Sequence, residues 1–386
     1  MIWWVAAALA QDPPPEPLKW SGLGLPLVGV NTIDGWGFGV AGEVYGRPPA
    51  VEYGYRLKFT VQLWATTRLD YTNDFVQIES RGDTIVTGRG GYRAWSNLSY
   101  AGVGGDAVAV LHGDVLERGN TVAGAVGFLG GARRVGDING GPIELYGQVY
   151  LRQVRAIAGP GTILERESPF GLGDGAFADV TLGVRLDTTD RWPMPTSGWK
   201  VEAAPSIGVT VLDDATPVGG ILLNAVRWVP LLDRRLVLGG RLLAMGTTGT
   251  RPFWEKEMTG GVWRNELGME TSFTGYGRAR TRGDSVVAAL MEVRPQLYEH
   301  GGQFWDFSVH ASLFAEQGWL FDAGGPNVPF GGDPGPPLPT VGGGPLVLWQ
   351  KAILLRPFVA WGWTAAGPGQ ERRPSLQYSV SFVDPL

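Results

Sequence analysis

The segment Trp305-Asp-Phe-Ser-Val-His-Ala-Ser-Leu-Phe-Ala-Glu316 decides the fold, because apolar and polar side chains alternate along it. Every second residue from Trp305 to Ala315 is apolar, and the residues between them, apart from Phe314, are polar. A period of two places the two sets on opposite faces of a β-strand. The segment therefore predicts a strand with one apolar face and one polar face.

The same alternation recurs along the chain, for example over residues 53–65, 199–211 and 376–382, and no helical period competes with it. With turn residues as boundaries, strands are expected at 36–46, 53–66, 68–80, 91–101, 106–116, 120–131, 142–157, 176–187, 198–211, 218–229, 234–247, 284–297, 302–316, 340–348, 351–364 and 374–383. Most are far longer than the five or six residues typical of globular sheets, and their number is even, as in bacterial transmembrane barrels. The predicted fold is all-β, a 16-stranded antiparallel transmembrane β-barrel in the bacterial outer membrane.

The expected connections alternate in length. The longest, 158–175, 248–283 and 317–339, follow odd-numbered strands, whereas short ones such as 231–233 and 349–350 follow even-numbered strands. Long extracellular loops and short periplasmic turns give this asymmetry. The 248–283 loop is rich in glycine and carries arginines at alternate positions, so it cannot form an apolar core. We expect it to fold back into the hydrated lumen.

Composition excludes several classes of function. A net charge of −5 argues against a nucleic-acid partner, and the absence of cysteine rules out disulfides and thiolate metal sites. The three histidines are dispersed, so no metal site is expected. The sequence shows neither a nucleophile elbow nor paired carboxylates. We therefore expect no enzymatic activity and no cofactor.

The N-terminus resembles an export signal, because an apolar run ends in Ala8-Leu9-Ala10. The expected organisation is a signal peptide over 1–10, a Pro-rich periplasmic segment over 11–24 and the barrel over 25–386.

Three motifs resemble those of the BamA/TamA family of outer-membrane barrels, also called the bacterial surface antigen family. The first is a strand and periplasmic turn over 183–199, the second is the start of the sixth extracellular loop from Phe253 to Gly261, and the third lies on strand thirteen. Their characteristic residues here are Asp187, Asp190, Pro195 and Gly198 in the turn, Gly260 and Gly261 in the loop, and Phe314, Glu316 and Gly318 on strand thirteen.

The loop tip departs from the family pattern. The resemblance implies an arginine that enters the lumen and pairs with the acidic residue of strand thirteen, but the corresponding stretch here is Phe273-Thr274-Gly275-Tyr276. Arg278, Arg280 or Arg282 could reach Glu316 instead. The alternative is that Glu316 is a lumen carboxylate solvated by water.

Two functions remain open. The resemblance implies an insertase or translocase whose first and last strands form a weak seam, with outer-membrane lipid, client polypeptides and a separately encoded periplasmic protein as partners. Here that seam would join residues 36–45, rich in glycine at Gly35, Gly37, Gly39, Gly42 and Gly46, to the last strand. The other hypothesis is a passive pore or structural barrel, which the lack of recognisable polypeptide-transport-associated domains favours.

The resemblance also implies that the last strand is the signal read by the assembly machinery, with Leu376, Tyr378, Val380 and Phe382 on one face. The strand phase makes a second prediction. Arginine should cost more at the lipid-facing Val209 or Leu313 than at the lumen-facing Thr210 or Ser312.

Overall fold

A computed structural model describes residues 17–31, 35–48, 56–67, 71–96, 119–138, 140–190, 194–256, 284–301, 306–321, 337–349, 353–362 and 375–382. These residues form one 16-stranded sheet in which each strand pairs antiparallel with its neighbour in the sequence. The strands are β1 (Lys19–Asn31), β2 (Gly35–Arg47), β3 (Leu57–Thr66), β4 (Tyr71–Ser80), β5 (Thr84–Trp95), β6 (Thr121–Ile138), β7 (Gly141–Ile157), β8 (Gly173–Asp187), β9 (Gly198–Val211), β10 (Ala215–Leu231), β11 (Leu236–Thr248), β12 (Ser285–His300), β13 (Phe307–Phe321), β14 (Thr340–Trp349), β15 (Ile353–Gly362) and β16 (Ser375–Phe382).

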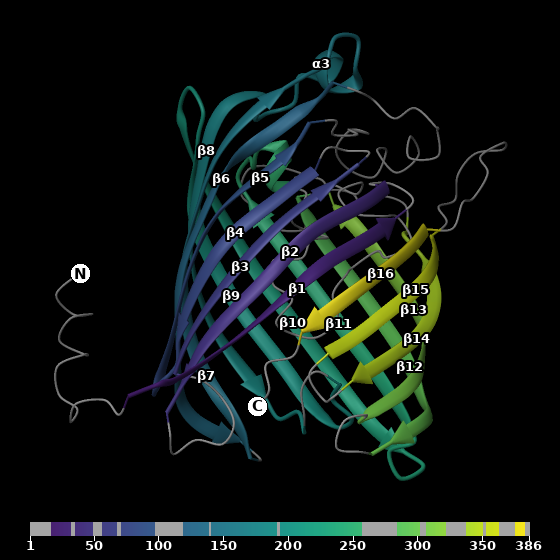
Figure 1. Ribbon diagram of the computed structural model, residues 1–386. Helices are drawn as coiled ribbons and strands as arrows, with labels where there is room; N and C mark the ends of the chain where they lie inside the picture. Colours follow the sequence, from purple (N-terminus) through teal and green to yellow (C-terminus); the bar gives the residue numbers. More distant parts are fainter. Residues whose placement is uncertain are drawn as a thin grey trace.

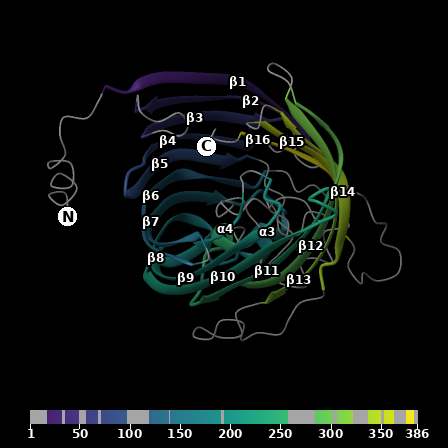
Figure 2. The same ribbon diagram turned by 90° about the horizontal axis from the view of Figure 1, so that it is seen from below.

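The sheet curls into a barrel whose strands are tilted against its long axis, and β1 comes to lie beside β16 (Figure 1). Two short helices belong to the connections, α3 (Ile163–Glu167) after β7 and α4 (Phe253–Lys256) after β11. Seen along the barrel, the strands form a ring around α4 (Figure 2). Among the described residues, no helix is both long and apolar enough to cross a membrane.

The predicted alternation is confirmed on β13 and β9, two of the strands that were used to infer it. On β13 the side chain of Leu313 is 59% exposed while its neighbour Ser312 is 1% exposed. On β9 the corresponding values are 73% for Ile207 and 0% for Thr210. Apolar side chains therefore cover the outside of the barrel, and the polar side chains that alternate with them on these strands point inward. An apolar outer surface of this extent requires lipid around it, so the chain is a transmembrane barrel of the outer-membrane type.

The first strand differs from the prediction. The strand β1 precedes residues 36–46, begins at Lys19 and pairs with β2 along its whole length. It was missed because leucines and valines occupy both faces and Pro26 lies in its middle, which hides the period of two. Proline is tolerated there because β1 lies at the end of the strand order. The Pro-rich segment expected over 11–24 is thus partly strand, and the signal peptide lies outside the described residues.

The described residues contain sixteen strands, which is the expected number, but these are not the same sixteen segments. The segment 106–116 lies outside the described residues, and the strand expected at 91–101 is β5, which begins at Thr84. Gly88, Gly90 and Gly91 interrupt the apolar pattern of β5 and obscure its start. By the bounds of the described strands, the longest intervals between consecutive strands are 96–120, 158–172, 249–284 and 322–339. All four follow odd-numbered strands, in agreement with the predicted length asymmetry.

The glycines of β2 have a packing role that the sequence reading did not assign. A Cβ atom on Gly37 would lie 2.0 Å from Cζ2 of Trp64, so the absent side chain makes room for the indole of β3. Since β2 is paired on both sides, its glycines do not form the outer edge of a seam.

Candidate functional site in the barrel lumen

The start of the long 249–284 connection lies inside the barrel. Phe253 and Trp254 of α4 are fully buried against lumen-facing side chains of β7 and β8, including Val154 and Phe177. The backbone N–H of Phe253 donates to the carbonyl of Phe170 at 2.9 Å. The indole N–H of Trp254 donates to the carbonyl of Gly171 at 3.0 Å, which joins this loop to the connection after β7.

Gly171 is required at that junction. Its φ of +104° lies in the left-handed region, and a Cβ atom there would approach Cβ of Pro252 to 2.5 Å. Both the backbone conformation and the space exclude a larger residue. The backbone of the connection after β7 therefore packs directly against side chains of the connection after β11.

An ion pair fixes the loop start to the barrel wall. Nη1 of Arg152, which points inward from β7, lies 3.1 Å from Oε1 of Glu255, and both side chains are 2% exposed. The same nitrogen donates to the carbonyl of Trp254 at 3.0 Å. Burial raises the pKa of the Glu255 carboxyl, while the charges of Arg152 and Arg251 oppose that rise. A buried carboxylate depends on such a partner.

Sequence reasoning missed this pair. The side chains of Tyr150, Arg152 and Val154 point from β7 into the lumen. The signal in the sequence was the charged residue Arg152 at an inward position of this strand. Its partner Glu255 belongs to the predicted Phe253–Gly261 motif, but the sequence offers no means of joining residues about a hundred positions apart.

Glu316 points into the lumen, as predicted, and is buried on β13. The strand registers align Arg241 of β11 with Leu290 of β12, and Leu290 with Glu316. Glu316 and Glu202 both act electrostatically on Arg241, whose Nε donates to Oδ1 of Asn224 at 3.0 Å. A guanidinium of the barrel wall therefore lies in the electrostatic field of Glu316.

The other two residues of the strand-thirteen motif have structural roles, one in packing and one in backbone hydrogen bonding. Phe314 meets Phe358 edge-on, with 5.9 Å between the ring centroids, and the carbonyl of Gly318 accepts from the N–H of Leu338 at 2.8 Å. The predicted loop residues lie outside the described residues, so their approach to Glu316 stays a prediction. They are Gly260, Gly261, Thr274, Gly275, Tyr276, Arg278, Arg280 and Arg282.

The motif predicted to form a periplasmic turn is a compact hydrogen-bonded unit between β8 and β9. Asp190 accepts from the N–H groups of Thr196 at 2.8 Å and Ser197 at 3.0 Å. Asp187 accepts from the N–H of Thr189 at 2.9 Å and lies 2.9 Å from Nζ of Lys200. Gly198 has a φ of +107°, which favours glycine at this position.

A second buried network secures this turn to the wall. Arg294 of β12 donates to the carbonyl of Pro195 at 3.2 Å and to Oε2 of Glu292 at 3.0 Å. The other carboxylate oxygen of Glu292 accepts from Ser312 at 2.6 Å. The Arg294 guanidinium lies 4.5 Å from the ring centroid of Trp228. Sequence reasoning assigned Ser312 to the lumen but found neither Glu292 nor Arg294.

The last strand is present, and its predicted residues pair with β15. Leu376 is opposite Val359, and Phe382 is opposite Ile353, with Tyr378 and Val380 between them. Recognition of this strand by an assembly machinery stays a prediction. In the part of the chain that the structure describes, no group of histidine, aspartate and glutamate residues could hold a metal ion.

No protein-family model and no curated protein matches the sequence. The fold is similar to that of several solved outer-membrane barrels. A structure of BamA from Haemophilus ducreyi lacking POTRA domains 1–3 is 15% identical, with a TM-score of 0.54 over 99% of this chain and 78% of that chain. CdiB from Acinetobacter baumannii is 12% identical, with a TM-score of 0.55 over 94% of this chain and 59% of that chain. CdiB from Escherichia coli is also 12% identical, with a TM-score of 0.56 over 96% of this chain and 64% of that chain. The chain thus spans less than two thirds of each CdiB chain.

Proposed function

We propose that the chain takes part in inserting or translocating polypeptides at the outer membrane, by opening the seam between β1 and β16. The observation that carries the proposal is the limited pairing of these two strands. Among the described residues, the strand order begins at β1 and ends at β16 without a hydrogen-bonded ladder between them, although the strands approach each other. An unpaired strand edge can accept a client strand through backbone hydrogen bonds.

Local sequence supports a weak seam. Pro26 lacks an N–H group, and Gly22, Gly24 and Gly29 give β1 little side-chain packing. On the other side, β16 pairs with β15 over only eight residues. A strand edge of this composition costs less to open than a continuous ladder of β-branched residues. The likeness of the fold to BamA and CdiB supports the same general kind of function, and the proposal assigns the chain no catalytic reaction.

A reversible disulfide crosslink across the seam tests the proposal. The native chain has no cysteine, so only the introduced cysteines can form a disulfide within it. Cysteines are placed one at a time at positions 22–28 of β1, each combined with Ser379→Cys in β16, until a pair forms a disulfide in cells. The matched control joins Gly24→Cys to Gly42→Cys, which are opposite each other on β1 and β2. The readout is the accumulation of other proteins in, or their passage across, the outer membrane.

The proposal expects the seam disulfide to stop that process and a reductant to restore it, while the control disulfide has no effect. Unchanged accumulation and passage with a fully crosslinked seam would contradict it. The hypothesis of a passive pore would then gain support if the crosslinked barrel conducted ions as the native barrel does.

A further inference from the structure

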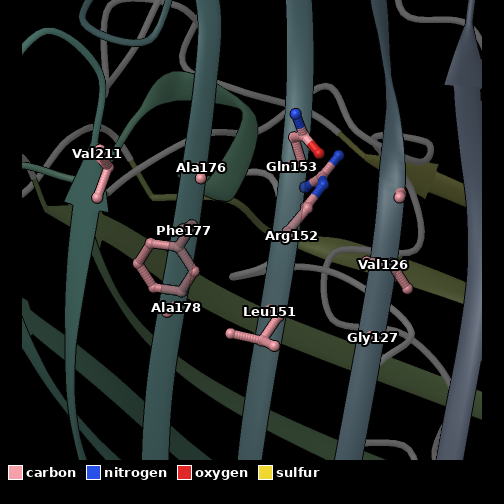
Figure 3. Close-up of a pocket in the computed structure, with 10 residues that line it drawn as sticks. Val126, Gly127, Leu151, Arg152, Gln153, Ala176, Phe177, Ala178 and Val211 are labelled. Carbon is pink, nitrogen blue, oxygen red and sulfur yellow. The ribbon is translucent and has the colours of Figure 1, made fainter.

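A groove of about 430 Å³ lies on the barrel between β6 and β9, in its half toward the long connections. Small side chains form its floor on either side of β7, namely Ala125 and Gly127 on β6 and Ala176 and Ala178 on β8. Leu151 and Val211 stand at its sides. Figure 3 shows Leu151 reaching from β7 toward β8, where Ala178 is its register partner. The groove is therefore a hollow between larger side chains.

Strand alternation places this groove on the lipid-facing surface. Leu151 is 55% exposed, whereas Arg152, the next residue on β7, points into the lumen and holds Glu255. On β8, likewise, Phe177 is buried in the lumen and the alanines before and after it point outward. Lipid chains fill such a hollow, because a void beside the wall would lose dispersion contacts on one side.

Polar side chains border the groove toward the long connections. Gln153 lines the groove, opposite Ala176, and the next outward pair along the same strands is Arg155 with Asp174. These two side chains are 72% and 78% exposed. Nε of Arg155 lies 3.6 Å from Oδ1 of Asp174, which is too long for a hydrogen bond, so the guanidinium keeps donors for another acceptor. An outward arginine above an apolar hollow suits an acyl chain with a phosphate at its head.

We propose that this groove is a lipid-binding site, in which an acyl chain of an anionic phosphate-bearing lipid lies between β6 and β9 and its headgroup contacts Arg155 and Gln153. The site is separate from the seam. Arg152 and Phe177 also border the groove, but their side chains are buried on the lumen side of the wall. A lipid molecule would thus bind at a fixed place on the outer surface of β6 to β9. This proposal does not depend on the proposed function.

Native mass spectrometry of the folded full-length barrel tests the proposal. The barrel is released from nanodiscs that contain equal amounts of phosphatidylglycerol and phosphatidylcholine, and the lipids that remain bound are counted. The native chain should retain phosphatidylglycerol in preference. Arg155→Gln should lower that retention about tenfold, the effect expected for one charge-assisted hydrogen bond.

A second variant fills the groove without changing charge. Ala176→Leu combined with Ala178→Leu should remove the retained lipid, whereas Ala203→Leu, on β9 outside the groove, should not. Equal retention of the two lipids by the native chain would overturn the proposal, as would equal retention by the groove-filled and control variants. Each variant is first checked for folding by its gel migration before and after boiling. If the groove-filled variant does not fold, Arg155→Gln alone decides the test.

Discussion

At the residue scale, Arg152 ties the long loop to the barrel wall through Glu255 and the carbonyl of Trp254. We expect Arg152→Met to leave a buried carboxylate without its cation and to cost about 3–5 kcal/mol. The loop should then become sensitive to protease in liposomes. Arg152→Met combined with Glu255→Leu should recover much of the loss, because no charge remains unpaired.

The control for this experiment is Arg134→Gln, which breaks the largely exposed pair with Asp137. Exposed pairs contribute about 1 kcal/mol at most, so this variant should behave like the native chain. If the Arg152→Met variant were as stable and as protease-resistant as the native chain, the ion pair between Arg152 and Glu255 would contribute nothing to stability.

Glu316 supplies a second prediction at this scale. One of Arg278, Arg280 and Arg282 is predicted to reach Glu316, so Glu316→Gln and the triple arginine-to-glutamine variant should each raise single-channel conductance. Combining them should add nothing, since both remove the same contact. The competing partner is Arg241, on which Glu316 acts within the barrel wall. If Arg241→Gln reproduced the effect and the triple variant did not, the loop anchor would be refuted.

At the scale of the element, each strand has a lipid face and a lumen face with different tolerance of charge. The sequence-based choice of Thr210 and Ser312 as tolerant lumen positions needs correction. Both are fully packed, and Ser312 donates to Glu292, so an arginine there would overfill the wall. On β3, Leu63 faces outward and Gln62 is a partly open lumen position, which makes them a better pair.

We expect Leu63→Arg to cost about 2–4 kcal/mol at mid-bilayer depth and Gln62→Arg to cost about 1 kcal/mol or less. The cause is the difference between lipid and a hydrated lumen around the same side chain. A urea titration of refolding into liposomes measures both values. Equal costs would mean that the faces of β3 are assigned wrongly.

At the scale of the whole molecule, the full-length chain should fractionate with the outer membrane and migrate differently on gels before and after boiling. Deleting residues 377–386 removes most of β16, the final strand of the sheet, and should abolish accumulation in that membrane. Immunoblots of membrane fractions give the measurement, with the full-length chain as control. Normal membrane levels of the truncated chain would contradict the role of the last strand.

The sequence by itself determined the class of fold and the two faces of β3, β9 and β13. The period of two is a local property that each lipid-facing strand carries in its own residues. The same period placed Glu316 in the lumen, whereas the turn around Asp187 and Asp190 was identified through the resemblance to the BamA/TamA family. The prediction failed for β1, where Pro26 and apolar residues on both faces remove the period.

Only the tertiary structure decided which groups in the lumen interact. Arg152 pairs with Glu255, Arg294 donates to the carbonyl of Pro195, and Glu316 acts electrostatically on Arg241. The partners are far apart in the sequence, and strand register and barrel curvature bring them near each other. The lipid-facing groove is likewise a property of four neighbouring strands, because small residues on β6 and β8 form a hollow only when β7 and β9 hold larger ones between and beside them. Side-chain periodicity specifies a face of one strand, whereas contacts between strands depend on how the whole sheet closes.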